Sequence, residues 1–437
     1  MLVKRAAEIK LLEEQYASLG NNLVILYGRN GMGKTTLITE FLQGKTKSVY
    51  YEGMECEDRL QLLLLNDRLG GIEWSGPEKE KRILVLDEFH FIIKSGEEIL
   101  KVLQLLDDPD RPVMIVLCSS SIRWVENEML ERLEGYASHI TAYMKLKDFT
   151  FVDFVNRFPN SSVETCIYIN SILGGIPQYL NEWREERTVR ENITHILLNK
   201  NSGLINAPQQ FLKLELREPA VYNTILYYLA QGNRKLNDLH ARTGFSRAKI
   251  SVYLKNLIQL DIVEKLVPLG EEGRENAKKG LYRIKDNFLS FWFCFVFPNI
   301  SDLMLGQADL VYDQKIAPFL DDYLREYFAD VCSEFLKLMN LQKRLSTNFL
   351  WWDRWYGKNG TLDILAKGEN KKTLVGKCIW SDEAASYQDY LNMLALAEEA
   401  KVSPDYCYLF SKKGFSEELR QMTEGKQEIN LIGLADL

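Results

Sequence analysis

The chain has 437 residues, of which 46% are hydrophobic and 26% are charged. This is ordinary globular usage and excludes a largely disordered or fibrous protein. Lys and Arg total 54 and Asp and Glu total 61, and the net charge of −7 excludes a histone-like polycation held to nucleic acid by bulk charge. At about 150 residues per domain, the length predicts roughly three domains.

Cysteine usage and apolar runs indicate the compartment. The seven cysteines show no CxxC pair and no Cys/His spacing typical of a metal site. Reduced thiols of a cytoplasmic protein are the expected interpretation. Residues 1–20 are expected to form an amphipathic helix and not a signal peptide. The strongest apolar run, residues 288–297, is too short to cross a bilayer, so we expect no membrane association.

Apolar runs alternate with helical patterns in the first 150 residues. The runs at 21–28, 48–52, 83–89 and 112–121 predict strands, and residues 34–42 predict a helix. This alternation is typical of α/β layering around a mostly parallel sheet. We therefore expect a first domain at residues 1–150.

After residue 150 the pattern of predicted helices and strands changes. Residues 151–259 predict helices with short breaks, and two short strands flank a charged insert at 270–280. Beyond them the pattern predicts helices at 318–340 and 383–399 and strands at 361–366, 373–379 and 406–410. We expect a helical lid at 151–215, a winged helix at 216–298 and a third domain at 299–437.

The segment that follows the first strand carries a phosphate-binding motif. Residues 28–36 read GRNGMGKTT and match GxxxxGK[ST] between a predicted strand and a predicted helix. Its glycines let backbone N–H groups point at phosphate oxygens, and the helix N-terminus favours the same anion. Lys34 is expected to reach the β- and γ-phosphates, and the Thr35 hydroxyl to ligate Mg²⁺. The predicted ATP-binding residues here are Gly28, Arg29, Asn30, Gly31, Met32, Gly33, Lys34, Thr35 and Thr36.

Two neighbouring strands end in polar residues that complete the site. The run ILVLDE brings Asp87 to the sheet edge, where it can hold Mg²⁺ through water, and places Glu88 to polarise the attacking water. Lys34 and Glu88 are thus the predicted catalytic residues. Alternatively, the two acids begin a solvated loop. Ser120 or Ser119 is expected to sense the γ-phosphate, although serines after a strand are often helix caps.

Two further features affect the nucleotide site. Hydrolysis of this kind usually needs an arginine, often supplied by a neighbouring subunit, so a homo-oligomer is one expectation. Arg123 and Arg132 follow the CSSS strand, but neither spacing singles one out, and ATP binding is therefore the firmer prediction. GGIP at residues 174–177 predicts that Pro177 lies over the base and sugar, or alternatively a plain helix break.

Residues 236–263 predict a helix-turn-helix core. Apolar residues follow helical spacing on both sides of a Thr-Gly turn, and the outward positions of the second helix are basic. This favours double-stranded DNA as partner, with a wing carrying Arg274, Lys278 and Lys279. The alternative is a winged helix that contacts protein or the ATPase lid. The predicted DNA-binding residues are Arg242, Ser246, Arg247, Lys249 and Lys255.

Taken together, the motifs carry a family resemblance. LYGRNGMGKTTLI, LVLDEF, LCSSS, GGIPQYL, ELREPAVYNTIL, YLKNLIQLDIVEKLVP and FLSFWFCFVFPN occur in order along the chain. The sequence resembles, over nearly its whole length, the archaeal-type P-loop ATPases of the STAND/AAA+ branch. The resemblance implies ATP and Mg²⁺ as cofactors, DNA-directed roles, and a C-terminal α/β domain of the restriction-endonuclease (PD-(D/E)XK) type.

The C-terminal domain departs from that resemblance at its expected active site. Asp363 matches the first metal-binding acid, but Lys377 stands where the second acid belongs, and Ile379 stands where the lysine belongs. Ala329 occupies a place where the family often has Glu. A lysine beside a metal site repels the cation, so we expect this nuclease fold to be inactive. The N-terminus also lacks a GRE lead-in, residues 136–139 lack an arginine, and NAP at 206–208 replaces EP.

The sequence therefore predicts an Mg²⁺–ATP-binding switch that couples ATP binding and hydrolysis to a winged helix on DNA. Two alternatives remain open from the residues alone. One is a non-enzymatic scaffold that holds nucleotide structurally and binds a protein partner. The other is an active, ATP-regulated DNA nuclease.

Overall fold

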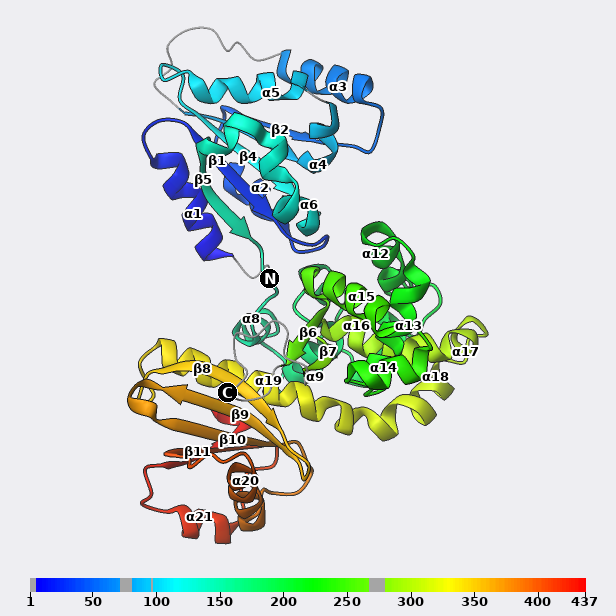
Figure 1. Cartoon of the computed structure of the whole chain (residues 1–437), viewed down its shortest axis with the longest axis vertical. Helices are drawn as coiled ribbons and strands as arrows, with labels where there is room; N and C mark the ends of the chain where they lie inside the picture. The colour runs from blue at the N-terminus through cyan, green and yellow to red at the C-terminus, as the bar shows by residue number, and fades with distance from the viewer. Residues whose placement is uncertain (1–4, 71–80, 96, 267–279) are drawn as a thin grey trace. The chain divides into compact units, whose positions relative to one another are not determined.

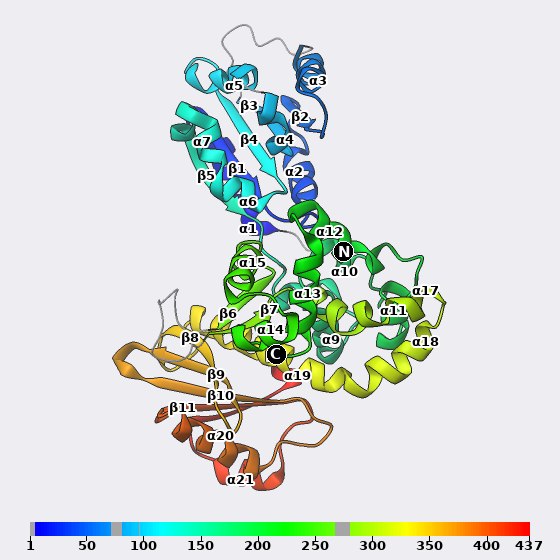
Figure 2. The same cartoon turned by 45° about the vertical axis from the view of Figure 1, so that its right-hand side comes forward.

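The computed structural model describes residues 5–70, 81–95, 97–266 and 280–437. The chain forms two compact units (Figures 1 and 2). The first comprises Met1–Asp148 together with Ile176–Gln178, and the second comprises Phe149–Gly175 together with Tyr179–Leu437. The first unit is therefore discontinuous in sequence.

A five-stranded parallel sheet forms the centre of the first unit. Its strand order is β2-β3-β4-β1-β5, and every pairing is parallel. Helices pack around it, as Figure 1 shows. The α/β class with a parallel sheet is confirmed. The strands are β1 (Asn22–Tyr27), β2 (Ser48–Glu52), β3 (Arg82–Asp87), β4 (Val113–Ser119) and β5 (Ile140–Lys145), and the helices are α1 (Ala6–Ala17), α2 (Lys34–Leu42), α3 (Asp58–Gly70), α4 (Phe89–Ile92), α5 (Glu97–Leu103), α6 (Ile122–Asn127) and α7 (Met129–Leu133).

Burial explains why these strands read as continuous apolar runs. The three inner strands β1, β3 and β4 are covered on both faces, and almost all of their residues are buried. Because the strands are parallel, their carboxyl ends meet at one edge of the sheet. The loops that follow β1, β3 and β4 therefore come together there, as is usual for ligand sites in open α/β sheets.

The second unit begins with helices, as expected for residues 151–259. These are α8 (Phe151–Arg157), α9 (Val163–Leu173), α11 (Val189–Ile196), α12 (Ala207–Glu215), α13 (Pro219–Ala230), α14 (Leu236–Thr243) and α15 (Arg247–Gln259), while α10 (Pro177–Leu180) begins in the first unit. Two short antiparallel strands, β6 (Val263–Leu266) and β7 (Leu281–Ile284), follow. The apolar run after β7 is helical: α16 (Asn287–Phe291) continues through a π turn toward α17 (Ile300–Met304).

Helices α13, α14 and α15 with β6 and β7 have the organisation of a winged helix. Gly244 ends α14 in the left-handed conformation with φ 71°, which glycine adopts without strain. Ser246 caps α15 by accepting a hydrogen bond from the Lys249 N–H. The inner face of α15 buries Ile250, Leu254 and Leu257. The predicted wing cations Arg274, Lys278 and Lys279 lie outside the described residues.

The C-terminal part of the second unit combines a long helix with a mixed sheet. After α18 (Ala308–Val311), helix α19 (Leu320–Leu341) leads to a sheet of order β12-β11-β10-β9-β8. The strands are β8 (Phe349–Tyr356), β9 (Thr361–Gly368), β10 (Thr373–Ile379), β11 (Tyr406–Ser411) and β12 (Ile429–Gly433), with helices α20 (Tyr387–Glu399) and α21 (Glu417–Thr423). Sequence reasoning missed β8, β12 and α21. Both missed strands are edge strands whose residues are mostly half-buried.

A network of six charged residues joins the winged helix to the C-terminal part. Arg283 on β7 makes a two-pronged ion pair with Asp330 on α19, at 3.0 Å for each nitrogen, and also pairs with Glu326 at 3.3 Å. Arg354 on β8 pairs with the same Asp330 at 3.1 Å. Burial alone would raise the pKa of Asp330, but Arg283 and Arg354 outweigh it and lower that pKa. Arg234 bonds Glu326 and Arg283 bonds Glu264, which complete the network.

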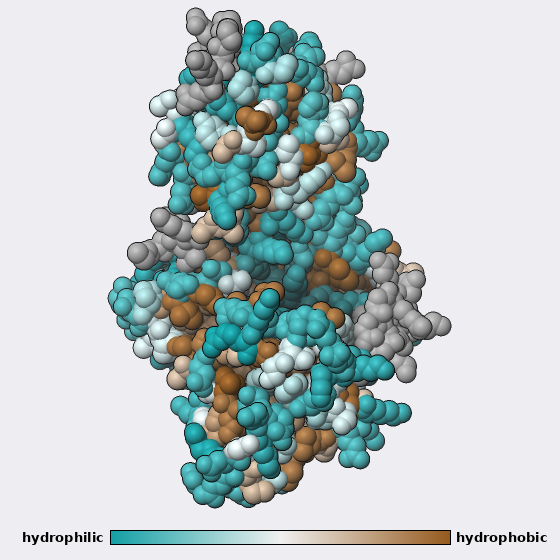
Figure 3. All heavy atoms as spheres, turned by 90° about the vertical axis from the view of Figure 1, so that its left-hand side faces the viewer, coloured by the Kyte–Doolittle hydropathy of each residue, from teal (hydrophilic) through white to brown (hydrophobic). Residues whose placement is uncertain are grey.

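The surface is predominantly polar on the face shown in Figure 3, where hydrophobic side chains form separate patches. Across the described residues, no helix combines the length and apolar composition that a membrane span requires.

Candidate functional site

The loop after β1 has the backbone conformation that a phosphate cradle needs. Gly31 and Gly33 have φ of 83° and 85°, which side chains other than glycine adopt only with strain. Lys34 begins α2 and is buried, and its Nζ donates to the carbonyl oxygens of Gly28 at 2.8 Å and Arg29 at 3.3 Å. The ammonium is thus folded over the loop. Thr35 and Thr36 lie exposed on the first turn of α2.

Segments distant in sequence hold this loop. Arg5 donates to the carbonyl oxygens of Met32 and Lys147, each at 3.0 Å. The Gln178 N–H donates to the Gly31 carbonyl at 3.2 Å, and a Cβ on Gly31 would lie 2.5 Å from the Gln178 Oε1. The GGIP segment therefore brings Pro177 beside the phosphate loop, within the first unit. Sequence reasoning singled out neither Arg5 nor Gln178, although Gln178 lies within the GGIPQYL motif.

Asp87, at the end of β3, is buried and accepts three hydrogen bonds. Its Oδ2 accepts from the Thr35 hydroxyl at 3.2 Å and from the Tyr50 hydroxyl at 2.8 Å, and its Oδ1 accepts from the Glu88 N–H at 2.9 Å. Burial and the bond to Asp87 raise the pKa of Tyr50, so the phenol stays protonated as donor. Tyr50 is a site residue that the sequence analysis missed, although β2 pairs directly with β3.

The Thr35 and Asp87 oxygens fit a magnesium ion, which prefers hard oxygen ligands and keeps several waters. The predicted metal pair is brought together, since the hydroxyl and the carboxylate lie within hydrogen-bond distance. Elsewhere in the described ranges, no group of three or more His, Cys, Asp or Glu could hold a metal ion by itself. A metal at Thr35 and Asp87 would therefore depend on phosphate oxygens for further ligands.

Glu88 is held in an unusual backbone conformation, with φ 47°. Its Oε2 accepts from the Ser120 N–H at 2.9 Å and from the Ser120 hydroxyl at 2.7 Å. The His90 Nδ1 lies 3.3 Å from the same oxygen and 3.1 Å from the Ser119 Oγ. Burial lowers the pKa of His90, although the neighbouring Glu88 opposes the shift. The predicted sensor Ser120 thus contacts the predicted base, and His90 is a further site residue that sequence reasoning missed.

The predicted DNA-binding residues lie at the end of α14 and along α15. Arg242, Ser246, Arg247 and Lys255 are exposed, and Lys249 is half-buried with its ammonium 4.9 Å from the centre of the Phe245 ring. The Arg247 Nε donates to the Asn237 side chain at 2.8 Å, which orients the guanidinium at the start of α15. None of the four basic residues forms an ion pair with an acid among the described residues, so their charges remain available to phosphates.

The expected nuclease centre contains an ion pair. The Lys377 Nζ lies 3.1 Å from the Asp363 Oδ2, and the Cys378 N–H donates to the same oxygen at 2.9 Å. The Lys377 ammonium also donates to the Thr361 carbonyl at 3.1 Å. Ala329 is buried on α19 and offers no ligand.

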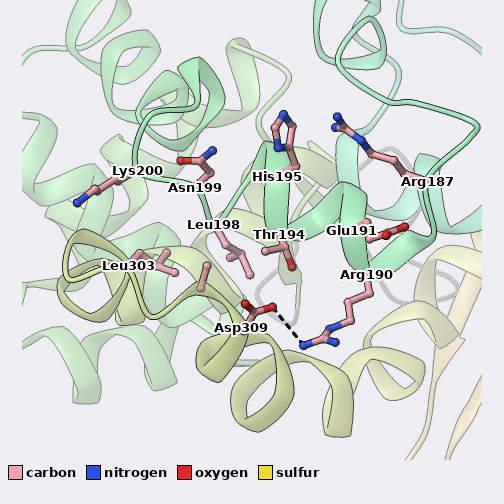
Figure 4. Close-up of a pocket in the computed structure, with 12 residues that line it drawn as sticks. Arg187, Arg190, Glu191, Thr194, His195, Leu198, Asn199, Lys200, Leu303 and Asp309 are labelled. Carbon is pink, nitrogen blue, oxygen red and sulfur yellow. Dashed lines mark hydrogen bonds and ion pairs between the residues drawn. The ribbon is translucent and has the colours of Figure 1, made fainter.

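The second unit also contains a groove of about 480 Å³ between α11 and the turn from α17 to α18 (Figure 4). The ion pair of Arg190 on α11 with Asp309 on α18, at 3.2 Å, joins its two sides. Thr194 points into the groove from α11, and its buried hydroxyl has no hydrogen-bond partner among the described residues. None of the predicted site residues lines this groove.

Three family models match successive parts of the chain. A family model described as an AAA domain matches residues 20–155. One described as a bacterial regulatory protein of the arsR family matches residues 223–265, and one described as archaea bacterial proteins of unknown function matches residues 292–390.

Individual relatives are archaeal. An uncharacterized protein of Methanocaldococcus jannaschii is 28% identical over 394 residues, which cover 87% of this chain and 88% of that protein. The Walker-type ATPase of Pyrococcus abyssi has a TM-score of 0.46 at 16% identity, covering 67% of this chain and 96% of that chain. The Aeropyrum pernix ORC2 protein has a TM-score of 0.45 at 15% identity, covering 70% and 96%. Both structures are too distant to bear on function.

The parallel sheet, the glycine loop with Lys34 and the acids after β3 define the first unit as a P-loop ATPase domain of the AAA type. The chain as a whole combines that domain with an arsR-type helix-turn-helix and the C-terminal region, which confirms the archaeal-type P-loop ATPase resemblance.

Proposed function

We propose that the protein is an Mg²⁺–ATP-dependent switch whose ATPase domain controls a winged helix bound to double-stranded DNA. The observation that carries the proposal is the convergence of Lys34, Thr35, Asp87 and Glu88 at one edge of the sheet, in a unit linked to an exposed basic helix. Seven unpaired cysteines favour action in the reducing cytoplasm.

The roles follow from the positions of the atoms. Lys34 would leave its loop carbonyls to contact phosphate oxygens, and Thr35 and Asp87 would hold the metal. A bound Mg²⁺ would neutralise part of the triphosphate charge. The Glu88 carboxylate would then accept a proton from the attacking water.

DNA contact is supported by the four basic side chains at the end of α14 and along α15, none of which forms an ion pair with an acid among the described residues. A helix of this kind in the major groove positions itself by phosphate contacts and reads base edges with its N-terminal residues. Ser246 and Arg247 occupy those first positions of α15. Arg242 and Lys255 are placed to contact phosphates.

The first experiment measures ATP hydrolysis with and without duplex DNA, in the wild type and in Glu88→Gln. We expect DNA to stimulate hydrolysis severalfold, and Glu88→Gln to reduce hydrolysis by about 100-fold or more while nucleotide still binds. DNA affinity should fall steeply with salt, because phosphate contacts release counterions. The double variant Arg247→Ala/Lys255→Ala should lose both DNA affinity and stimulation. A salt-independent complex with a protein, and none with DNA, would favour the scaffold alternative.

For the C-terminal region we propose a nuclease-derived fold without nuclease activity. The ammonium of Lys377 lies where a cation would contact Asp363, so the internal ion pair takes the place of the metal. Such a domain would still be able to contact DNA or protein.

We expect no plasmid nicking by the wild type with Mg²⁺ or Mn²⁺. The double variant Lys377→Glu/Ile379→Lys removes the ammonium and supplies the second acid and the lysine, so it should gain Mn²⁺ binding measurable by calorimetry. Adding Asp363→Ala should abolish that gain. Nicking by the wild-type protein that disappears in Asp363→Ala would instead establish the regulated nuclease.

A further inference from the structure

The two oxygens of the Glu88 carboxylate have different surroundings. Oε2 receives both donors of Ser120 and faces the His90 Nδ1. Oε1 has no hydrogen bond to any part of the chain that the structure describes. The carboxylate is therefore anchored through one oxygen and leaves the other available as an acceptor.

The Nδ1-protonated tautomer of His90 suits both neighbours of that nitrogen. Its N–H would donate to the Ser119 Oγ at 3.1 Å and would place positive hydrogen beside the Glu88 Oε2, which lies 3.3 Å from Nδ1. With the proton on Nε2, Nδ1 would accept from the Ser119 hydroxyl, but its lone pair would face the carboxylate oxygen. The side chain is 12% exposed, and its ring also packs against Phe91 at 4.1 Å between ring centres, so it has little freedom to turn away.

Ser119 supports His90 from the end of β4. Its Oγ accepts from the Ser121 N–H at 3.2 Å, which fixes the hydroxyl beside the imidazole. The buried side chain of Ser119 and the neighbouring Ser120 thus have separate roles, since one orients the histidine and the other binds the carboxylate.

We propose that His90 is a positioning residue for ATP hydrolysis, which together with Ser120 fixes the Glu88 Oε2 so that Oε1 accepts the proton of the attacking water. The inference rests on the proposed ATPase function. A general base works when it is held at hydrogen-bond distance from its water, and a misplacement of about 1 Å can cost roughly 100-fold in rate. The strained φ of Glu88 fits a side chain held in one working orientation.

The kinetic test replaces His90 and measures binding separately from turnover. His90→Ala should lower kcat about ten- to hundredfold and leave KM and the affinity for a fluorescent ATP analogue unchanged. His90→Asn retains a donor nitrogen near the position of Nδ1 and should restore most of kcat. In a Glu88→Gln background, His90→Ala should cause no further loss, because both substitutions remove the same function.

His139→Ala is the matched control. His139 also faces a carboxylate, Asp107, at 3.3 Å, but it precedes β5 at the opposite edge of the sheet. Its loss should leave kcat unchanged. A fall in nucleotide affinity that matches the fall in kcat, or a further loss in the Glu88→Gln background, would overturn the proposal.

A second measurement tests the proposed role of His90 without relying on ATP hydrolysis. Nitrogen NMR of the histidine-labelled protein, with the His90 signal assigned through His90→Asn, should show the proton on Nδ1 in the wild type. In Glu88→Ala the Nε2–H tautomer should gain population. An Nε2–H tautomer in the wild type would refute the proposal that His90 helps to fix the Glu88 carboxylate. The expected tautomer in a protein that does not hydrolyse ATP would refute only the proposed hydrolysis.

Discussion

Replacing Lys34 with alanine should abolish ATP binding. Its buried ammonium lies on the Gly28 and Arg29 carbonyls inside the phosphate loop, and each charge-assisted hydrogen bond that it transfers to phosphate contributes about 1.5–3 kcal/mol. Two such bonds correspond to a loss of affinity of about 100-fold or more. Equilibrium titration with a fluorescent ATP analogue in the presence of Mg²⁺ measures the effect directly.

Lys45→Ala provides the control for this experiment. Lys45 also belongs to the first unit, but it lies beyond the C-terminal end of α2, where it pairs with Glu13 at 2.7 Å. Its removal should leave nucleotide affinity unchanged. If Lys34→Ala bound ATP as tightly as the wild type, the phosphate site would not lie at residues 28–36, and the switch proposal would fail with it.

Replacing Arg283 with methionine should strongly destabilise the second unit. Arg283 is largely buried and pairs with Glu264, Glu326 and Asp330, so its loss removes the cation that these three part-buried carboxylates share. Breaking a buried ion pair costs about 3–5 kcal/mol when a charge is left without any partner. We expect a cost near the lower end, because Arg234 and Arg354 still pair with Glu326 and Asp330. The expected result is faster hydrogen–deuterium exchange across β7 and α19 and a lower urea midpoint, while nucleotide binding by the first unit is retained.

The control is Arg190→Met. Arg190 forms ion pairs with Asp309 and Asp313, but all three side chains are about half exposed or more, so its loss should cost less than about 1 kcal/mol. If the two substitutions lowered the free energy of unfolding equally, burial of the network would contribute nothing to stability.

Low pH should destabilise the same network of charged residues. The arginines of the network lower the pKa of Glu326 and of Asp330 below their ordinary values against the opposing effect of burial. A carboxyl with a lowered folded pKa contributes stability above its unfolded pKa and loses that contribution as pH falls through the folded pKa. The second unit should therefore lose stability below about pH 4, and Arg283→Met should flatten this dependence.

Much of the fold could be predicted because its strands are buried on both faces. Residues of β1, β3 and β4 form short apolar runs rich in Val, Ile and Leu, each followed by polar or turn residues, which favours buried strands. The edge strands β8 and β12 gave no such signal. Their residues are mostly half-buried, and Asp353 and Arg354 interrupt the aromatic residues of β8, so its pairing depends on neighbours distant in sequence.

The residues of the nucleotide site also fall into a group that the sequence could predict and a group that it could not. Lys34, Thr35, Asp87 and Glu88 could be predicted because a local motif places each at the end of a strand or the start of a helix. Tyr50, His90, Arg5 and Gln178 act through contacts across strands or between distant segments, and a single sequence carries no spacing rule for those contacts. Arg123 and Arg132 remain unassigned as arginine fingers.

The return of Ile176–Gln178 to the first unit has a practical consequence for dissecting the protein. A fragment that stops at Asp148 would omit the amide that binds Gly31, and would carry a phosphate loop lacking one of its supports. The polypeptide passes between the two units three times. The first two passages lie beside each other, because the Phe149 N–H donates a hydrogen bond to the Gly175 carbonyl oxygen at 2.9 Å. Any excised ATPase fragment should therefore extend at least to Gln178, and a protease cut at any one of the three passages would leave residues of one unit on the same fragment as residues of the other.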